Sequence, residues 1–119
     1  MLKLYYNPHC SKSRQALALL QQAKLTPKLI DYQSHPPSIE TLQNLISRSE
    51  HSLKDFIRTN DPDYNTYCPK NPSEHELLTL LHQHPKLLQR PILDTPTQVI
   101  IARTPEILIP ILHTLTQNT

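Results

Sequence analysis

The feature that most constrains this chain is that none of its 119 residues is glycine, whereas 12 are proline. Glycine adopts positive φ most readily and lets phosphate groups approach the backbone closely. Its absence therefore excludes the glycine-rich loops of P-loop and dinucleotide-binding proteins. It also predicts that turns with positive φ use asparagine or aspartate, and the candidates are Asn60, Asp61 and Asn65.

Charge and cysteine content narrow the class of protein further. Twelve lysines and arginines against ten aspartates and glutamates leave a net charge of +2, which is too balanced for binding nucleic acid by charge alone. No apolar stretch approaches the ~18 residues needed to span a membrane, and Asn7, Pro8 and His9 interrupt any secretory signal. Two cysteines are too few for a disulfide framework. We therefore expect a cytoplasmic protein with no nucleic-acid or membrane partner.

Hydrophobic periodicity predicts the order of the elements. Residues 2–6 and 28–32 are expected strands, and a helix over 13–23 joins them into a right-handed βαβ unit. Further helices are expected over 38–48, over 52–58 and from a capping box at Ser73 to Pro85. A hairpin of strands at 91–93 and 98–102 comes next. The last element is expected to be a helix that starts at Thr104 and is kinked by Pro110.

This order predicts an α/β fold of the thioredoxin-like type. The expected sheet is mixed and has about four strands. A helical insertion at about 38–85 separates the βαβ unit from the C-terminal ββα unit. The length suits a single domain over residues 1–119.

Cys10 stands where the first expected strand gives way to the first helix, in the sequence NPHCSKSR (7–14). Unpaired N–H groups of the first helical turn and the helix dipole favour a thiolate there, so the pKa of Cys10 should fall below that of a free cysteine. The same N–H groups can hold an oxyanion. The alternative is a buried structural cysteine beside a helix cap. Side chains that can support a thiolate or an anion here are His9, Ser11, Lys12, Ser13 and Arg14.

Three arginines stand at element boundaries, where a fold commonly places functional groups. They are Arg58, Arg90 and Arg103. A guanidinium keeps its charge at any working pH, and its fork of donors matches a tetrahedral oxyanion. The alternative is that these arginines are ordinary solvated charges.

Four separated motifs together resemble the arsenate reductase family. They are NPHCSKSR around Cys10, FIRTND with Arg58, QRPIL with Arg90 and Pro91, and ARTPE with Arg103. The similarity runs from residue 2 to about residue 113. Within the family, the chain is most similar to the glutaredoxin-coupled branch and its paralogues with Ser-Lys-Ser after the cysteine.

The resemblance implies an oxidoreductase with no bound cofactor. Cys10 would be the nucleophile, and Arg58, Arg90 and Arg103 would hold arsenate or a similar oxyanion. Pro91 would follow a cis peptide bond. Glutathione would be the co-substrate and a glutaredoxin the partner, because a lone cysteine in a CxxS loop depends on external thiols.

Two other functions stay open at this point. A CxxS site at a thioredoxin-like helix start also suits thiol exchange on another substrate through glutathione mixed disulfides. Regulators that bind RNA polymerase share the fold, although those with a redox switch carry CxxC where this chain has Ser13. Cys68 is expected to be a bystander, and the spacing of the histidines predicts no metal site.

Overall fold

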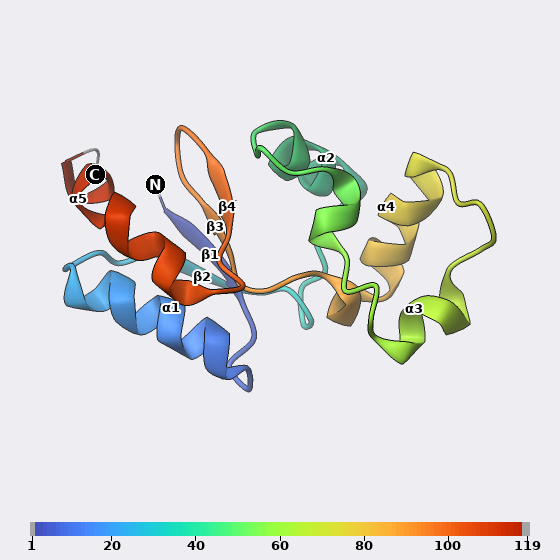
Figure 1. Ribbon diagram of the computed structural model, residues 1–119, viewed down its shortest axis with the longest axis horizontal. Helices are drawn as coiled ribbons and strands as arrows, with labels where there is room; N and C mark the ends of the chain where they lie inside the picture. Colours follow the sequence, from blue (N-terminus) through green and yellow to red (C-terminus); the bar gives the residue numbers. More distant parts are fainter. Residues whose placement is uncertain (1, 118–119) are drawn as a thin grey trace. The chain divides into compact units, whose positions relative to one another are not determined.

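The structure is a computed structural model that describes residues 2–117. The chain forms two compact units. The first unit comprises the chain up to Asp31 and from Arg90 onwards, and it contains the sheet. The second unit, Tyr32–Gln89, is helical (Figure 1). No helix within the described residues is long and apolar enough to cross a bilayer.

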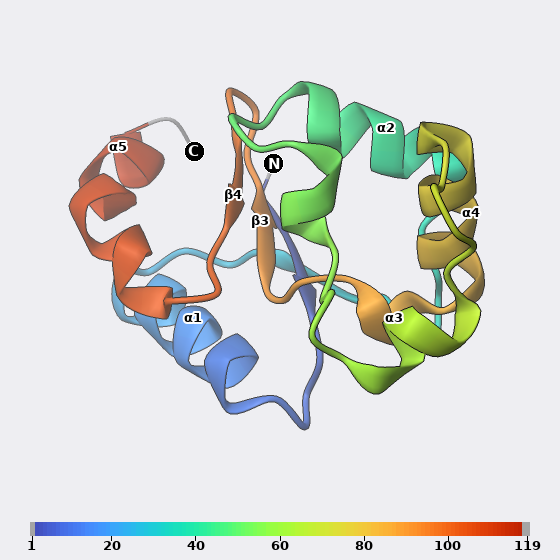
Figure 2. The same cartoon turned by 45° about the vertical axis from the view of Figure 1, so that its right-hand side comes forward.

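The sheet has four strands in the order β2-β1-β3-β4. The bounds are β1 (Lys3–Tyr6), β2 (Lys28–Asp31), β3 (Ile92–Asp94) and β4 (Val99–Ile101). Strands β1 and β2 are parallel, as the crossover through helix α1 (Ser11–Gln22) requires. Strand β3 is antiparallel to both β1 and β4, and β3 and β4 form a hairpin (Figure 2). The expected mixed α/β sheet and its thioredoxin-like topology are confirmed.

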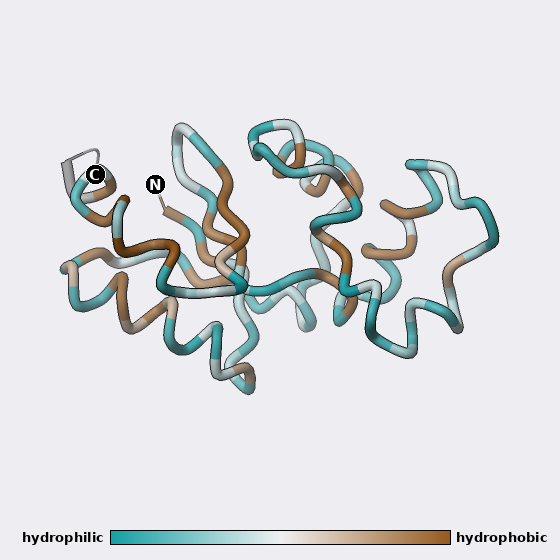
Figure 3. The backbone as a smooth tube through the Cα atoms, in the orientation of Figure 1, coloured by the Kyte–Doolittle hydropathy of each residue, from teal (hydrophilic) through white to brown (hydrophobic). Residues whose placement is uncertain are grey.

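One face of this sheet is covered by α1 and the C-terminal segment, which are blue and red in Figure 1. That segment is a 3₁₀ helix, η3 (Pro105–Ile111), followed by helix α5 (Leu112–Gln117). Hydrophobic residues are concentrated along β4 and η3 (Figure 3). The buried core between these layers consists of Leu2, Leu4, Ala16, Leu20, Leu25, Leu93, Ala102, Leu108 and Leu115.

Pro110 lies close to the border between two types of helix. The expectation of a single kinked helix from Thr104 is wrong, because η3 ends at Ile111 and α5 starts at Leu112. A proline ring inside an α-helix clashes with the carbonyl four residues earlier. A 3₁₀ helix pairs residues three apart, which explains how Pro110 is accommodated.

Two residues of the described chain have positive φ, namely Lys24 at 63° and Asn71 at 48°. An asparagine therefore serves at one turn, as its short polar side chain allows. The other turn uses a lysine, against expectation. The predicted positions are wrong, since positive φ occurs at none of Asn60, Asp61 and Asn65.

The turn at Lys24 ends α1 in a Schellman motif. The Lys24 N–H donates to the Gln21 carbonyl, and the Leu25 N–H donates to the Leu20 carbonyl, both at 2.9 Å. Leu20 and Leu25 both belong to the buried core of the first unit. The burial of these two side chains and the two hydrogen bonds offset the cost of positive φ at a residue that carries a Cβ.

The second unit is built from three α-helices and two short 3₁₀ helices. Their bounds are α2 (Ile39–Ser47), η1 (Leu53–Phe56), α3 (Pro62–Tyr67), α4 (Glu74–Gln83) and η2 (Pro85–Leu87). Helices α2 and α4 contact each other, and an isolated bridge pairs Ile57 with Leu88. The predicted capping box is confirmed, because Ser73 and Glu76 exchange hydrogen bonds of 2.9 and 3.1 Å.

Helix α3 covers most of the segment 60–65, which was expected to be a turn after the helix at 52–58. That prediction is wrong. Asp61 caps the helix by accepting from the Asp63 N–H at 2.9 Å, and Pro62 occupies the first helical position. An aspartate followed by a proline is a typical helix start. The helix is only six residues long, so its hydrophobic pattern was too short to identify it.

Candidate active site around Cys10

Cys10 is the N-cap residue of α1, with φ −98° and ψ 123°. Its N–H donates to the Asn7 carbonyl at 2.9 Å, and its carbonyl accepts from the Arg14 N–H at 3.1 Å. The Cys10 side chain therefore stands at the start of the helix, next to the N–H groups of its first turn.

Ser13, in the first turn of α1, connects the helix to the loop before Cys10 through a hydrogen bond. Its side chain is fully buried, and its Oγ accepts from the Asn7 N–H at 3.2 Å. The Asn7 side chain in turn accepts from the His9 N–H at 2.9 Å, which forms an Asx turn. Asn7 was missed as a supporting residue, although an asparagine before Pro8 is a recognisable turn signal.

The other predicted supporting residues lie at the surface. His9, Ser11, Lys12 and Arg14 are exposed. Arg14 folds back over the loop, because its Nη1 donates to the Pro8 carbonyl at 3.2 Å. It therefore holds the shape of the loop as well as adding positive charge.

The pKa of the Cys10 thiol is lowered to about 7. Partial burial acts in the opposite direction and by itself would raise the pKa. Hydrogen bonds from the Ser13 N–H, the Arg90 guanidinium, the Ser13 hydroxyl and the Lys12 N–H outweigh that effect. A large fraction of Cys10 is therefore a thiolate at neutral pH, which is the nucleophilic form of cysteine.

Arg90 and Arg103 lie at the same end of the β3–β4 hairpin. The antiparallel register pairs Ile92 with Ile101, and the Ala102 N–H then donates to the Pro91 carbonyl at 2.9 Å. Arg90 and Arg103 follow one step further along this ladder. The Arg90–Pro91 peptide bond is cis, as the resemblance implied.

The Cys10 loop leaves the sheet at this same end. Strand β1 is antiparallel to β3, with Tyr5 opposite Ile92. The C-terminal end of β1, which leads into the loop, therefore lies next to the N-terminal end of β3, where Arg90 stands. The first unit thus brings Cys10, Arg90 and Arg103 together although they are far apart in sequence.

Arg58 belongs to the second unit, two residues after the end of η1. Its Nη1 donates to Oδ2 of Asp61 and to the Lys86 carbonyl, each at 3.4 Å. Its own N–H donates to the Leu87 carbonyl at 2.7 Å. Within its unit Arg58 is therefore firmly anchored.

Cys68 is the C-cap residue of α3 and, like Cys10, is a free thiol. Its Sγ lies 3.5 Å from the Pro69 carbonyl, and a hydrogen bond between Cys68 and Tyr64 raises the pKa of the tyrosine. No group of three or more histidine, cysteine, aspartate or glutamate side chains in the described chain could hold a metal ion.

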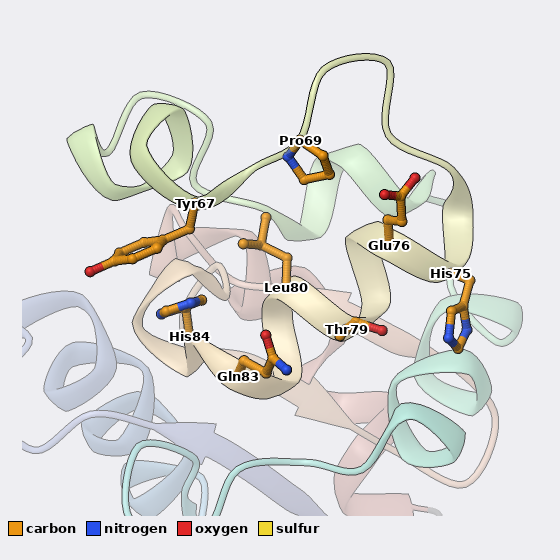
Figure 4. Close-up of a pocket in the computed structure, with 8 residues that line it drawn as sticks. All are labelled: Tyr67, Pro69, His75, Glu76, Thr79, Leu80, Gln83 and His84. Atoms are coloured by element: carbon orange, nitrogen blue, oxygen red, sulfur yellow. The ribbon is translucent and has the colours of Figure 1, made fainter.

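A pocket of about 480 Å³ lies beside α4 in the second unit (Figure 4). The ring of Tyr67 stacks on the imidazole of His84, with centroids 4.0 Å apart and an interplanar angle of 15°. Neither cysteine and none of the three predicted oxyanion arginines lines this pocket. Its lining residues are Tyr67, Pro69, His75, Glu76, Thr79, Leu80, Gln83 and His84.

Known proteins resemble this chain over nearly its whole length. It is 33% identical over 112 residues to the arsenate reductase of Haemophilus influenzae, covering 92% of this chain and 97% of that protein. It is 31% identical over 113 residues to an arsenate reductase of Escherichia coli, covering 93% and 80%. The solved arsenate reductase from Vibrio cholerae superposes with a TM-score of 0.85 at 32% identity, covering 92% and 96%. The sequence profile of the ArsC family matches residues 5–108. The chain therefore belongs to the ArsC family, as its four motifs predicted.

Proposed function

We propose that this protein reduces arsenate to arsenite, with glutathione as the electron donor and a glutaredoxin as the recycling partner. The observation that supports this most is the Cys10 thiol, which has a pKa of about 7 and accepts a hydrogen bond from the Arg90 guanidinium. Such a site combines a nucleophile with a donor for an oxyanion. The arsenate reductases among its relatives support the choice of oxyanion.

In the first step the Cys10 thiolate attacks arsenic, a sulfur–arsenic bond forms, and one arsenate oxygen leaves as water after protonation. In the second step a glutathione thiolate attacks the Cys10 sulfur. A sulfur–sulfur bond forms as the sulfur–arsenic bond breaks, and the electron pair of the broken bond stays on arsenic. Arsenic is thereby reduced from As(V) to As(III) and leaves as arsenite, while Cys10 is left in a mixed disulfide with glutathione.

The mixed disulfide requires a further thiol for its removal. The loop between Cys10 and Ser13 contains no second cysteine, and Cys68 belongs to the other unit. A glutaredoxin thiolate therefore attacks the glutathione sulfur, and Cys10 is released as a thiolate. A protein that depends on the glutathione system in this way would work in the cytoplasm, and this mechanism uses no bound cofactor.

Arg58, Arg90 and Arg103 would supply the charge that offsets the oxyanion. Negative charge accumulates on the arsenate oxygens as the thiolate attacks, so the donors matter more in the transition state than in the ground state. Arg90 and Arg103 already lie at the Cys10 end of the sheet. Arg58 belongs to the second unit, and its own substitution tests its role.

The test is arsenite formation by the purified protein with arsenate, glutathione and glutaredoxin. We expect turnover with all components and little when glutathione or glutaredoxin is omitted. A parallel reaction replaces arsenate with hydroxyethyl disulfide and omits the glutaredoxin, which would reduce this disulfide by itself. Turnover of the disulfide without any arsenite formation would contradict the proposal and favour a thiol oxidoreductase for another substrate.

A further inference from the structure

We propose that Asp61 is a positioning residue for Arg58, which it holds so that one edge of the guanidinium stays available to an oxyanion. This inference rests on the proposed function, in which Arg58 contacts the oxyanion. It is carried by contacts within the second unit alone.

Arg58 is anchored from two directions. Its backbone is fixed by two hydrogen bonds, from its N–H to the Leu87 carbonyl at 2.7 Å and from the Asp61 N–H to its own carbonyl at 3.0 Å. Its side chain is fixed at Nη1, which donates to Asp61 Oδ2 and to the Lys86 carbonyl, each at 3.4 Å. The side chain is one-third exposed, so it remains accessible to a ligand.

The remaining donors of Arg58 form one edge of the planar group. A guanidinium has five N–H bonds, and Nη1 carries two of them. Among the residues that the structure describes, none accepts a hydrogen bond from Nε or Nη2 of Arg58. Nε and Nη2 donate in the same direction and match two oxygens of a tetrahedral anion.

Asp61 is well placed to fix this orientation because it is itself held. Its side chain is only 10% exposed. Oδ1 caps helix α3 by accepting from the Asp63 N–H at 2.9 Å, which turns Oδ2 toward Arg58. One carboxylate therefore determines both where α3 begins and where the guanidinium points.

Asp61 is shared between Arg58 and a nearby lysine. The Nζ of Lys86 lies 3.8 Å from Asp61 Oδ1 and 2.8 Å from Asp63 Oδ2. Only Nη1 of Arg58 is engaged with Asp61, so the Nε and Nη2 edge of the guanidinium stays available to an anion while Nη1 is held in place.

Asp61→Asn separates positioning from helix capping. Asparagine caps a helix as well as aspartate does, so α3 should persist. The substitution removes the negative charge next to Arg58. It also allows the amide N–H₂ of asparagine to face Nη1 of Arg58, which is itself a donor. We expect kcat/KM for arsenate to fall about tenfold, the loss typical of one charged hydrogen bond. Asp61→Ser, which also caps, is the second variant should Asp61→Asn fail to fold.

Two controls make this measurement specific to Arg58. Asp63→Asn removes the 2.8 Å ion pair to Lys86 without touching Arg58, and should leave kcat/KM within about twofold. In an Arg58→Ala background, Asp61→Asn should have almost no further effect, because the two residues act as a unit. Equal losses in both backgrounds, or no loss in an active parent, would overturn the positioning role.

A second measurement does not depend on activity. Nuclear magnetic resonance relaxation of the Arg58 Nε–H should show a rigid side chain in the parent and in Asp63→Asn, and a mobile one in Asp61→Asn. An unchanged order parameter in Asp61→Asn would overturn the inference even if the protein reduces arsenate. If the parent forms no arsenite, the proposed function fails, and this relaxation measurement still decides whether Asp61 holds Arg58.

Discussion

The guanidinium of Arg90 donates a hydrogen bond to the sulfur of Cys10, across 80 positions of sequence. The contact exists because β1 and β3 are antiparallel neighbours, so the loop after β1 meets the residues before β3. It links the helix-start chemistry of Cys10 to the arginines of the hairpin.

The thiol of Cys10 should titrate near neutral pH. We expect the rate of its alkylation by iodoacetamide, followed in a Cys68→Ser background, to rise with a midpoint at about 7. Arg90→Gln should move this midpoint upward, because it removes a donor that favours the thiolate. Arg48→Gln, on the second unit, is the matched control and should leave it in place. A midpoint at or above ~8.5, the value for an ordinary cysteine, would show that the site does not activate the thiol.

The same lowered pKa should make the stability of the fold depend on pH. The folded-state pKa of Cys10 lies below that of an unfolded thiol, so folding favours the thiolate. Its stabilising contribution is therefore complete above the unfolded pKa and is lost as pH falls through about 7. In urea unfolding under reducing conditions, the advantage of the parent over Cys10→Ser should be larger at pH 9 than at pH 6. A difference that is constant over this range would contradict the linkage.

Removing any one of the three arginines should impair arsenate reduction. We expect a lower kcat/KM for each of three variants, Arg58→Ala, Arg90→Ala and Arg103→Ala. The loss should correspond to about 2–4 kcal/mol of transition-state stabilisation, the usual cost of losing a donor to a developing oxyanion. Lysine at these positions should restore only part of the activity, since an ammonium lacks the planar fork.

Arg48→Ala is the control for the arginines, because Arg48 ends α2 and bonds to Asn44 at 3.0 Å. Its kcat/KM should stay near that of the parent. If the three arginine variants behave like Arg48→Ala, the protein has no arginine oxyanion site.

The capping box of α4 should be measurable in the stability of the protein. Ser73→Ala removes the hydroxyl that accepts from the Glu76 N–H at 3.1 Å, and should lower the free energy of unfolding by about 1 kcal/mol. Gln43→Ala, at an exposed position of α2, should change it by less than about 0.5 kcal/mol. Equal effects of the two substitutions would show that the cap does not stabilise α4.

The elements with regular patterns could be predicted from the sequence. The strands at β1 and β2 and the amphipathic α1 follow from hydrophobic periodicity, and the position of Cys10 follows from the strand-to-helix junction. The predictions that failed concern short segments and single turns. Lys24 adopts positive φ in the turn that ends α1, and a lysine is not a typical residue for such a turn, so the residue type gave no signal.

The candidate site also has features that the local sequence predicts and features that depend on the fold. The helix start around Cys10 is local, so its effect on the thiol could be argued from NPHCSKSR alone. The neighbourhood of Arg90 and Arg103 depends on strand order and register, for which only the family resemblance gave a reason. The bond between Asp61 and Arg58 was missed because the segment from Asn60 to Asn65 was interpreted as a turn rather than as the start of α3.

The most direct test of the central claim compares the two cysteines in arsenite formation. Parent, Cys10→Ser and Cys68→Ser proteins are assayed with arsenate, glutathione and glutaredoxin, after circular dichroism has shown that each is folded. If Cys10 is the nucleophile and external glutathione resolves the adduct, Cys10→Ser should form no arsenite and Cys68→Ser should keep most of the parent's rate. Arsenite formation by Cys10→Ser, or its loss in a folded Cys68→Ser, would contradict this mechanism.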